Sequence, residues 1–151
     1  MAFLRSMSLF LVAAVPFLTM AGCPIDGLSF LLPNEIRVEI VNDTNFSIDP
    51  HIEFDEDDGL LGGLFTGEEL DTGLIAAGET QIFRFDCDSL GTIRSDEAEQ
   101  FFGILGSAAA DSSPTLQRDD DYDCGDTIRF RFVGDGSDFG VIVSVNGRIV
   151  G

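Results

Sequence analysis

Short segments in which apolar and polar residues alternate are the feature that most constrains the fold. The clearest segment covers residues 127–133, where Ile128, Phe130 and Phe132 alternate with a threonine and two arginines. Successive side chains of a β-strand point to opposite faces, so this pattern places the three apolar side chains on one face. The same alternation recurs over residues 36–41, 46–54, 81–85 and 141–145. These segments are therefore expected to be strands with one buried face.

Turn-forming residues separate the expected strands. Asn42-Asp43 follows the first strand, residues 134–137 carry two glycines, and Asn146-Gly147 is the strongest two-residue signal for a β-hairpin. About seven short strands divided by such turns predict an all-β fold, an immunoglobulin-like β-sandwich.

Four places allow more than one local structure. Pro50 lies on the inward-facing set of its strand, which favours an edge strand or a bulge. Residues 66–69 have the threonine-to-glutamate spacing of a capping box, which favours one or two helical turns. Ser95 is a candidate helix cap, but residues 100–105 fit a strand equally well, and we expect the strand. Residues 108–123 are expected to be mostly loop.

The chain begins with a segment typical of an export signal. A basic residue precedes an apolar run, residues 6–20, that is shorter than the roughly 20 residues needed to span a bilayer. The run ends in Met20-Ala21-Gly22-Cys23, which resembles the lipobox of bacterial lipoproteins. That resemblance implies cleavage before Cys23 and attachment of a diacylglyceryl group to its sulfur. The alternative is an ordinary secretory signal that leaves Cys23 unmodified.

This interpretation divides the chain into three parts. Residues 1–22 are a signal peptide, residues 23–34 hold the lipidated Cys23 and a tether, and residues 35–151 form an acidic β-sandwich domain. Two or more acyl chains anchor a protein stably, whereas one does so only marginally. We therefore expect the domain on the extracytoplasmic side of a bacterial cell envelope, attached to a membrane through its lipid.

The cysteine content fits an exported protein. The chain has 3 cysteines, and if Cys23 carries lipid, Cys87 and Cys124 remain as a pair. Pairs of cysteines persist as disulfides in oxidising compartments. We therefore predict a Cys87–Cys124 disulfide; the alternative is two free thiols.

The charge of the chain excludes one class of partner. There are 27 acidic residues against 8 basic ones, giving a formal net charge of −19. Such a charge repels the phosphate backbone, so nucleic-acid binding is not expected. Acidic runs are ordinarily solvated surface, and the alternative is that they bind a divalent cation.

Calcium is the cofactor for which the chain has candidate ligands, because calcium takes oxygen atoms. The candidate metal ligands are the acids of one loop: Asp119, Asp120, Asp121, Asp123 and Asp126. Their spacing is not that of an EF-hand. We expect no cofactor, with calcium as the alternative. Zinc is not expected, because the chain has a single histidine and its cysteines are already assigned.

No motif for catalysis is found. The single histidine, His51, is expected on the outward face of a strand among acidic residues, and the chain has no lysine and no nucleophile elbow. We predict no catalytic residues. Arg84, Arg129 and Arg131 are expected to form cross-strand pairs with Glu39 or Glu53 rather than an anion site. If the domain binds a partner, the candidate binding residues are Leu60, Leu61, Leu64 and Phe65.

Three functions follow from these observations. The first is a non-enzymatic, lipid-anchored envelope protein with a structural or binding role toward a protein or polysaccharide. The second is a calcium-dependent adhesion or matrix-binding module. The third and weakest is an envelope hydrolase that uses paired carboxylates.

Overall fold

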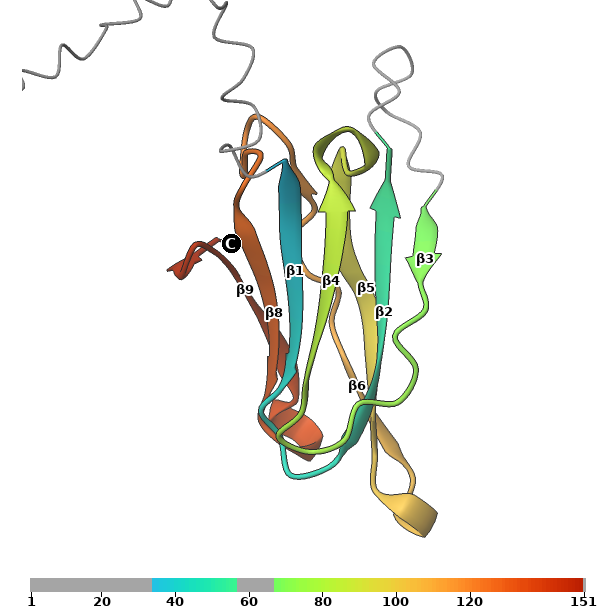
Figure 1. Ribbon diagram of the computed structural model, residues 1–151. Coiled ribbons are helices and arrows are strands. Elements are labelled where there is room, and N and C mark those ends of the chain that lie inside the picture. Colours follow the sequence, from blue (N-terminus) through green and yellow to red (C-terminus); the bar gives the residue numbers. More distant parts are fainter. Residues whose placement is uncertain (1–33, 57–66, 151) are drawn as a thin grey trace, which may run out of the picture.

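The computed structural model describes residues 34–56 and 67–150 (Figure 1). The strands in this part are β1 (Glu35–Asn42), β2 (Ser47–Asp55), β3 (Glu68–Leu70), β4 (Thr80–Asp86), β5 (Thr92–Phe101), β6 (Ser107–Ala110), β7 (Leu116–Gln117), β8 (Thr127–Val133), β9 (Gly140–Val145) and β10 (Arg148–Ile149). Three single 3₁₀ turns lie between them, namely η2 (Cys87–Ser89), η3 (Gly103–Leu105) and η4 (Gly136–Asp138). Over these ranges no helix has the length and apolarity needed to cross a bilayer.

The strands form two sheets of a β-sandwich. The first sheet has the order β10-β9-β8-β1-β4, and the second has the order β3-β2-β5-β6, with β7 also paired to β5. β1 runs parallel to β8 and antiparallel to β4. The predicted all-β sandwich with one disulfide is confirmed. Ten strands are present where about seven were expected. Four of the ten, namely β3, β6, β7 and β10, have only two to four residues each, which leaves little signal in the sequence.

The core is made by the alternating residues that the sequence singles out. Ile128, Phe130 and Phe132 of β8 are all fully buried, and the buried apolar residues of β1 in the same sheet and of β2 in the other sheet belong to the same core cluster. Full burial of one such side chain stabilises the fold by about 1.5–3 kcal/mol. Pro50 of β2 is also buried, and it lies next to a register shift between His51 and Ile52 where β2 pairs with β5. The residue left unpaired by this shift is Asp96 of β5, so the bulge lies in the partner strand beside Pro50 and not at the proline itself.

Two local predictions are wrong. Residues 68–70 form strand β3 rather than helical turns, and residues 103–105 form the turn η3 rather than the end of a strand. Residues 108–123 are mostly loop, as expected, apart from the end of β6 and the two-residue strand β7. Pairing with β2 or β5 makes β3, β6 and β7 strands, which a local propensity does not capture.

The predicted disulfide is confirmed. Cys87 and Cys124 are 37 positions apart in sequence, and their Cα atoms are 5.6 Å apart. Cys87 follows β4 and Cys124 precedes β8, while β1 lies between these two strands in the first sheet. The disulfide therefore joins the two neighbours of β1 at the end where β1 begins.

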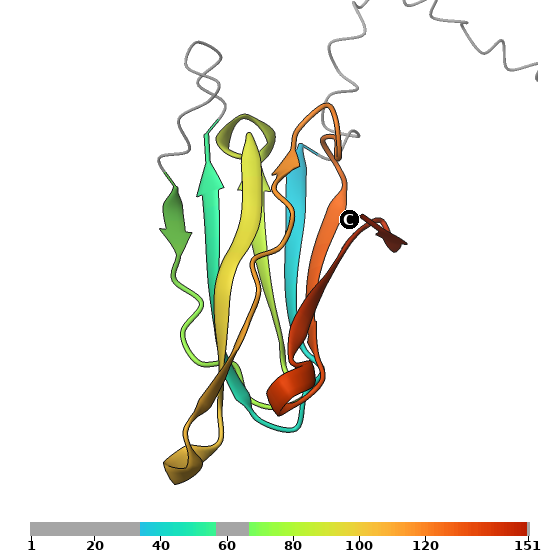
Figure 2. The ribbon, with the colours of Figure 1, turned by 180° about the vertical axis from the view of Figure 1, so that it is seen from behind.

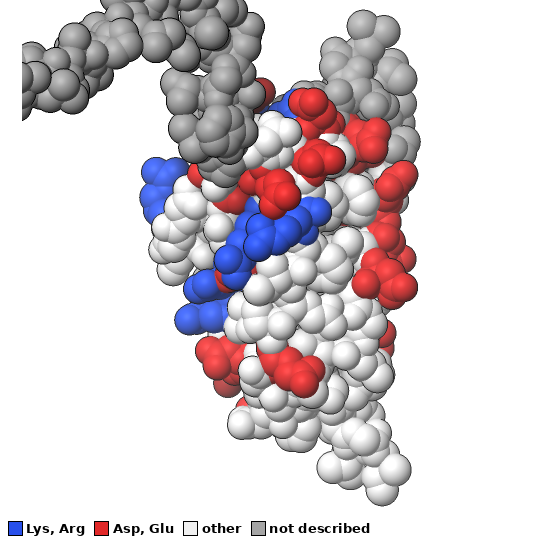
Figure 3. All heavy atoms as spheres, viewed as in Figure 1, with Lys and Arg blue, Asp and Glu red and all other residues white. Residues whose placement is uncertain are grey.

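The two ends of the sandwich differ in composition. The start of β1, the end of β4 and the start of β8 lie at one end, whereas the β5–β6 hairpin extends beyond the body at the other (Figures 1 and 2). Acidic side chains gather towards the first end, and the protruding hairpin shows no charged atoms in this view (Figure 3). A partner would therefore meet a different surface at each end.

Candidate functional site

The five acids that the sequence proposes as metal ligands line one hollow. It has a volume of about 260 Å³ and lies between the loop before β8 and the β9–β10 hairpin. The lining residues are Asp119, Asp120, Asp121, Tyr122, Asp123, Asp126, Val145, Asn146 and Arg148. The structure thus brings together acids that are spread over eight positions of sequence, from 119 to 126.

A buried tyrosine fixes the loop of this hollow. Tyr122 is only 2% exposed, and its hydroxyl lies 3.2 Å from the carbonyl oxygen of Leu90 and 3.1 Å from that of Gly91. The amide of Asp119 donates to the carbonyl oxygen of Tyr122 at 2.9 Å, which closes a tight turn. Asp119 has a φ of 67°, a left-handed conformation that aspartate adopts more readily than most residues.

Two of the five carboxylates already accept hydrogen bonds from backbone amides. Asp121 accepts a hydrogen bond from the amide of Gln117 at 2.9 Å. Asp126 accepts from the amide of Asp123 at 2.8 Å and, through its other oxygen, from the side-chain amide of Asn146 at 2.6 Å. These bonds hold the loop against the hairpin turn. Between residues 34 and 150, leaving out 57–66, no three metal-ligating side chains are grouped to hold an ion.

A second cluster lies on the first sheet, where a buried carboxylate pairs with two arginines. Glu39 is 7% exposed, and its carboxylate oxygens lie 2.8 Å from Arg37 and 2.5 Å from Arg129. Arg84 pairs with Glu35 at 3.0 Å. The expected Arg129–Glu39 pair is therefore confirmed, whereas Arg84 pairs with a different glutamate. Arg131 has no ion pair within the described ranges, contrary to expectation.

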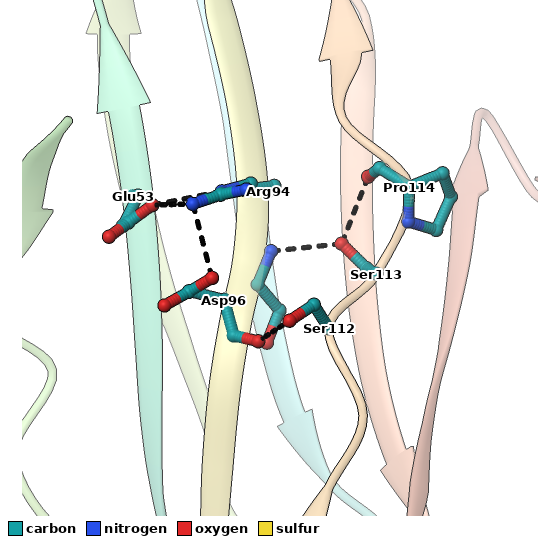
Figure 4. A network of polar contacts seen from close by, with 7 residues as sticks. Glu53, Arg94, Asp96, Ser112, Ser113 and Pro114 are labelled. Carbon is teal, nitrogen blue, oxygen red and sulfur yellow. Dashed lines mark hydrogen bonds and ion pairs between the residues drawn. The ribbon is translucent and has the colours of Figure 1, made fainter. Parts of the chain in front are cut away.

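A third polar network surrounds the bulge in β5 and was not foreseen. Arg94 lies 2.6 Å from Glu53 of β2 and 3.1 Å from Asp96, the residue that the register shift leaves unpaired (Figure 4). Ser112 donates to the carbonyl oxygen of Asp96, and the amide of Ser95 donates to the hydroxyl of Ser113 at 2.9 Å. The network holds the segment between β6 and β7 against β5. Sequence reasoning missed it because the partners are brought together only by the bulge.

The single histidine lies on an exposed strand face, as expected. His51 Nδ1 lies 2.6 Å from a carboxylate oxygen of Glu69 on β3, and 45% of the His51 side chain is exposed. The hydrogen bond that His51 donates to Glu69 raises the pKa of His51 above its ordinary value; partial burial lowers this pKa, and the charges of Glu69, Asp49 and Glu99 raise it. His51 and Glu69 therefore form an exposed ion pair when the imidazole is protonated.

Protonated His51 is expected to stabilise the fold slightly at acidic pH. Since its pKa is raised in the folded state, this contribution is present below pH 6.5 and is lost as the pH rises through the folded-state pKa. The pair is exposed, so its size is about 0.2–1 kcal/mol. Titration of the single imidazole by NMR should give a pKa above 6.5 that falls in Glu69→Gln. A folded-state pKa equal to that of an unfolded peptide would contradict the pair.

Two sets of predicted site residues lie outside the described part of the chain. They are the proposed lipidation site, Cys23, and the candidate binding residues Leu60, Leu61, Leu64 and Phe65. Both remain predictions.

Comparison with known proteins adds a remote structural likeness. No family model and no curated protein matches the chain. Among solved structures, the chain is similar to one described as "Crystal Structure of Gram Negative Toxin", with 11% sequence identity and a TM-score of 0.40. The alignment covers 76% of this chain and 23% of the other, so this chain spans less than a quarter of that protein's length. A likeness of this size assigns no function.

Proposed function

We propose that this protein is a non-enzymatic, lipid-anchored protein of the bacterial cell envelope, whose β-sandwich domain has a structural or binding role. The observation that carries the proposal is the Cys87–Cys124 disulfide. Disulfides persist outside the cytoplasm and are rare within it, so the bond supports export. It also accounts for two of the 3 cysteines and leaves Cys23, at the end of the signal-like segment, as the one available for lipid.

The position of β1 supports a short attachment to the membrane. β1 begins at Glu35, so residues 24–34 separate its start from Cys23. Even fully extended, this tether reaches about 35 Å. The end of the sandwich that holds the disulfide and the acidic hollow is the end to which the tether connects. The proposed anchor therefore keeps that end nearer the membrane than the β5–β6 hairpin.

Mass spectrometry of the mature N-terminus tests the anchor directly. The expected N-terminal peptide begins at Cys23 and carries a diacylglyceryl group on sulfur, with the protein in the membrane fraction. The matched control is Cys23→Ser, which removes the acceptor sulfur and leaves the disulfide pair intact. A mature chain that begins after Cys23, or an unmodified Cys23 thiol, would reject the proposal.

The second candidate is a calcium-dependent adhesion or matrix-binding module, and the hollow lined by five aspartates favours it. Asp119, Asp120 and Asp123 would have to turn towards a bound ion, because Asp121 and Asp126 are held by backbone amides and Asn146. Calorimetry of the full chain with calcium separates the candidates. The second predicts heat and a higher melting temperature at millimolar calcium that are lost in Asp123→Asn; the first predicts neither.

A further inference from the structure

The β5–β6 hairpin ends in two apolar side chains that touch almost nothing. Ile104 is 103% exposed and Leu105 is 85% exposed, and both lie in η3 at the tip of the hairpin. Other exposed apolar residues, such as Ile149 at 68%, are scattered singly over the surface. Single exposed apolar residues are ordinary, whereas two adjacent ones at the end of a projection point to a function. We name residues 101–107 the apolar tip.

The backbone of the apolar tip is closed on itself. The amide of Phe102 donates to the carbonyl oxygen of Gly106 at 2.9 Å, and the amide of Leu105 donates to that of Phe102 at 3.3 Å. Gly103 and Gly106 have φ values of 65° and 110°, which allow this tight loop. Backbone groups that enter hydrocarbon must find partners within the protein, and these hydrogen bonds provide some of them.

The apolar tip is also free of charge in a strongly acidic protein. Residues 100–110 contain no charged residue, although the chain as a whole has 27 acids. In space the protruding end of the molecule is white, whereas red side chains gather at the far end (Figure 3). Within the tip, Phe102 packs edge-to-face against Phe46 of the body, with ring centroids 4.7 Å apart.

We infer that the apolar tip inserts into the surface of an electrically neutral lipid bilayer. The tip is convex and its side chains Ile104 and Leu105 stand clear of the protein, so a fluid apolar medium fits them without a shaped partner. The core of a protein interface is packed as tightly as a protein interior, so a protein partner would need a pocket shaped for Ile104 and Leu105, whereas a bilayer does not. Transfer of two such side chains into hydrocarbon favours the bound state by about tenfold to a hundredfold each.

The charge of the protein restricts which bilayer it can approach. With a formal net charge of −19, the protein is repelled by anionic headgroups. Insertion is therefore expected to be strongest with zwitterionic lipid and weaker as anionic lipid is added. The inference does not depend on the proposed lipid anchor, which connects to the opposite end of the sandwich. The tip therefore points towards a second bilayer when the long axis of the domain stands away from the anchoring membrane. When that axis lies parallel to the anchoring membrane, the tip can reach the same bilayer.

A single tryptophan at the tip provides the test, because the chain has no native Trp. The full chain carrying Leu105→Trp is mixed with phosphatidylcholine vesicles. The expected result is a shift of emission to shorter wavelength and quenching by lipids brominated on their acyl chains. The matched control, Ile149→Trp, places the reporter at an exposed apolar position outside the tip, and its emission should not change. Adding Ile104→Asp to the Leu105→Trp protein should abolish the shift.

The remaining outcomes separate the inference from its alternatives. Unchanged emission from position 105 at high lipid concentration would overturn it. A shift that appears without lipid as the protein concentration rises would also overturn it, because the tip would then bind a second copy of the chain. A shift caused only by an added envelope protein would indicate a protein partner instead. Mass spectrometry of the mature N-terminus reports the proposed anchor separately, so an unmodified Cys23 together with a retained shift would count against the anchor alone.

Discussion

Removing the disulfide by Cys87→Ser together with Cys124→Ser is expected to lower the free energy of unfolding by about 4 kcal/mol. The two cysteines are 37 positions apart, so the disulfide closes a long loop in the unfolded chain and reduces its conformational entropy. A small domain has a total stability of only 5–15 kcal/mol, so the loss is a large share of it. Urea unfolding of the two proteins at equilibrium measures the difference.

The folded state adds to the effect of the disulfide. Cys87 is 4% exposed, and its carbonyl oxygen accepts a hydrogen bond from the side chain of Arg118. Loosening of this point would also affect the start of β1, because the amide of Cys87 donates to the carbonyl oxygen of Asn34 at 3.3 Å. The matched control is Cys23→Ser, which should leave the unfolding free energy unchanged. A loss below about 1 kcal/mol in the double serine variant would mean that the unfolded chain keeps its ends together without the bond.

The strands that could be predicted from the sequence are those whose own residues carry the signal. β8 and β1 alternate so regularly that Phe130 and Ile36 could be placed in the core from spacing alone. β6 could not, because Ser107–Ala110 has no apolar alternation and becomes a strand only by pairing with the end of β5. The signal for β6 therefore resides in its partner.

The candidate sites divide in the same way. The five aspartates of the hollow lie close in sequence, and their gathering could be predicted. That Asp121 and Asp126 are held by amides could not, because the bonds depend on turn geometry and on Asn146, which is 20 positions from Asp126. The exposure of Ile104 and Leu105 was hidden for a different reason. An apolar pair within a strand-like pattern suggests core, and only the position of the hairpin turn shows that these residues project into solvent.

Replacing Asn42 is expected to have the second large effect on the free energy of unfolding. In the sequence, Asn42-Asp43 indicates only a turn after the first strand. Asn42 lies at the end of β1 and is fully buried. Its side-chain amide donates to the carbonyl oxygens of Phe46 at 2.7 Å and Ile75 at 2.9 Å. Its oxygen accepts from the amide and hydroxyl of Thr44 at 3.1 and 2.8 Å. Ile75 pairs with Ile48 of β2, so one side chain links the two sheets.

Asn42→Ala is expected to lower the free energy of unfolding by about 2–4 kcal/mol, because it leaves buried donors and acceptors without partners as well as removing hydrogen bonds. Urea unfolding gives the value, and faster amide exchange at Ile48 and Ile75 should accompany it, since their two mutual hydrogen bonds of 3.0 and 2.9 Å lose their support. Asn45→Ala is the matched control. Asn45 is exposed and its side chain bonds Asp135 at 2.6 Å in solvent, so its loss should cost less than about 1 kcal/mol. Equal losses in the two variants would show that the burial of Asn42 and its link between the sheets contribute nothing beyond an ordinary turn.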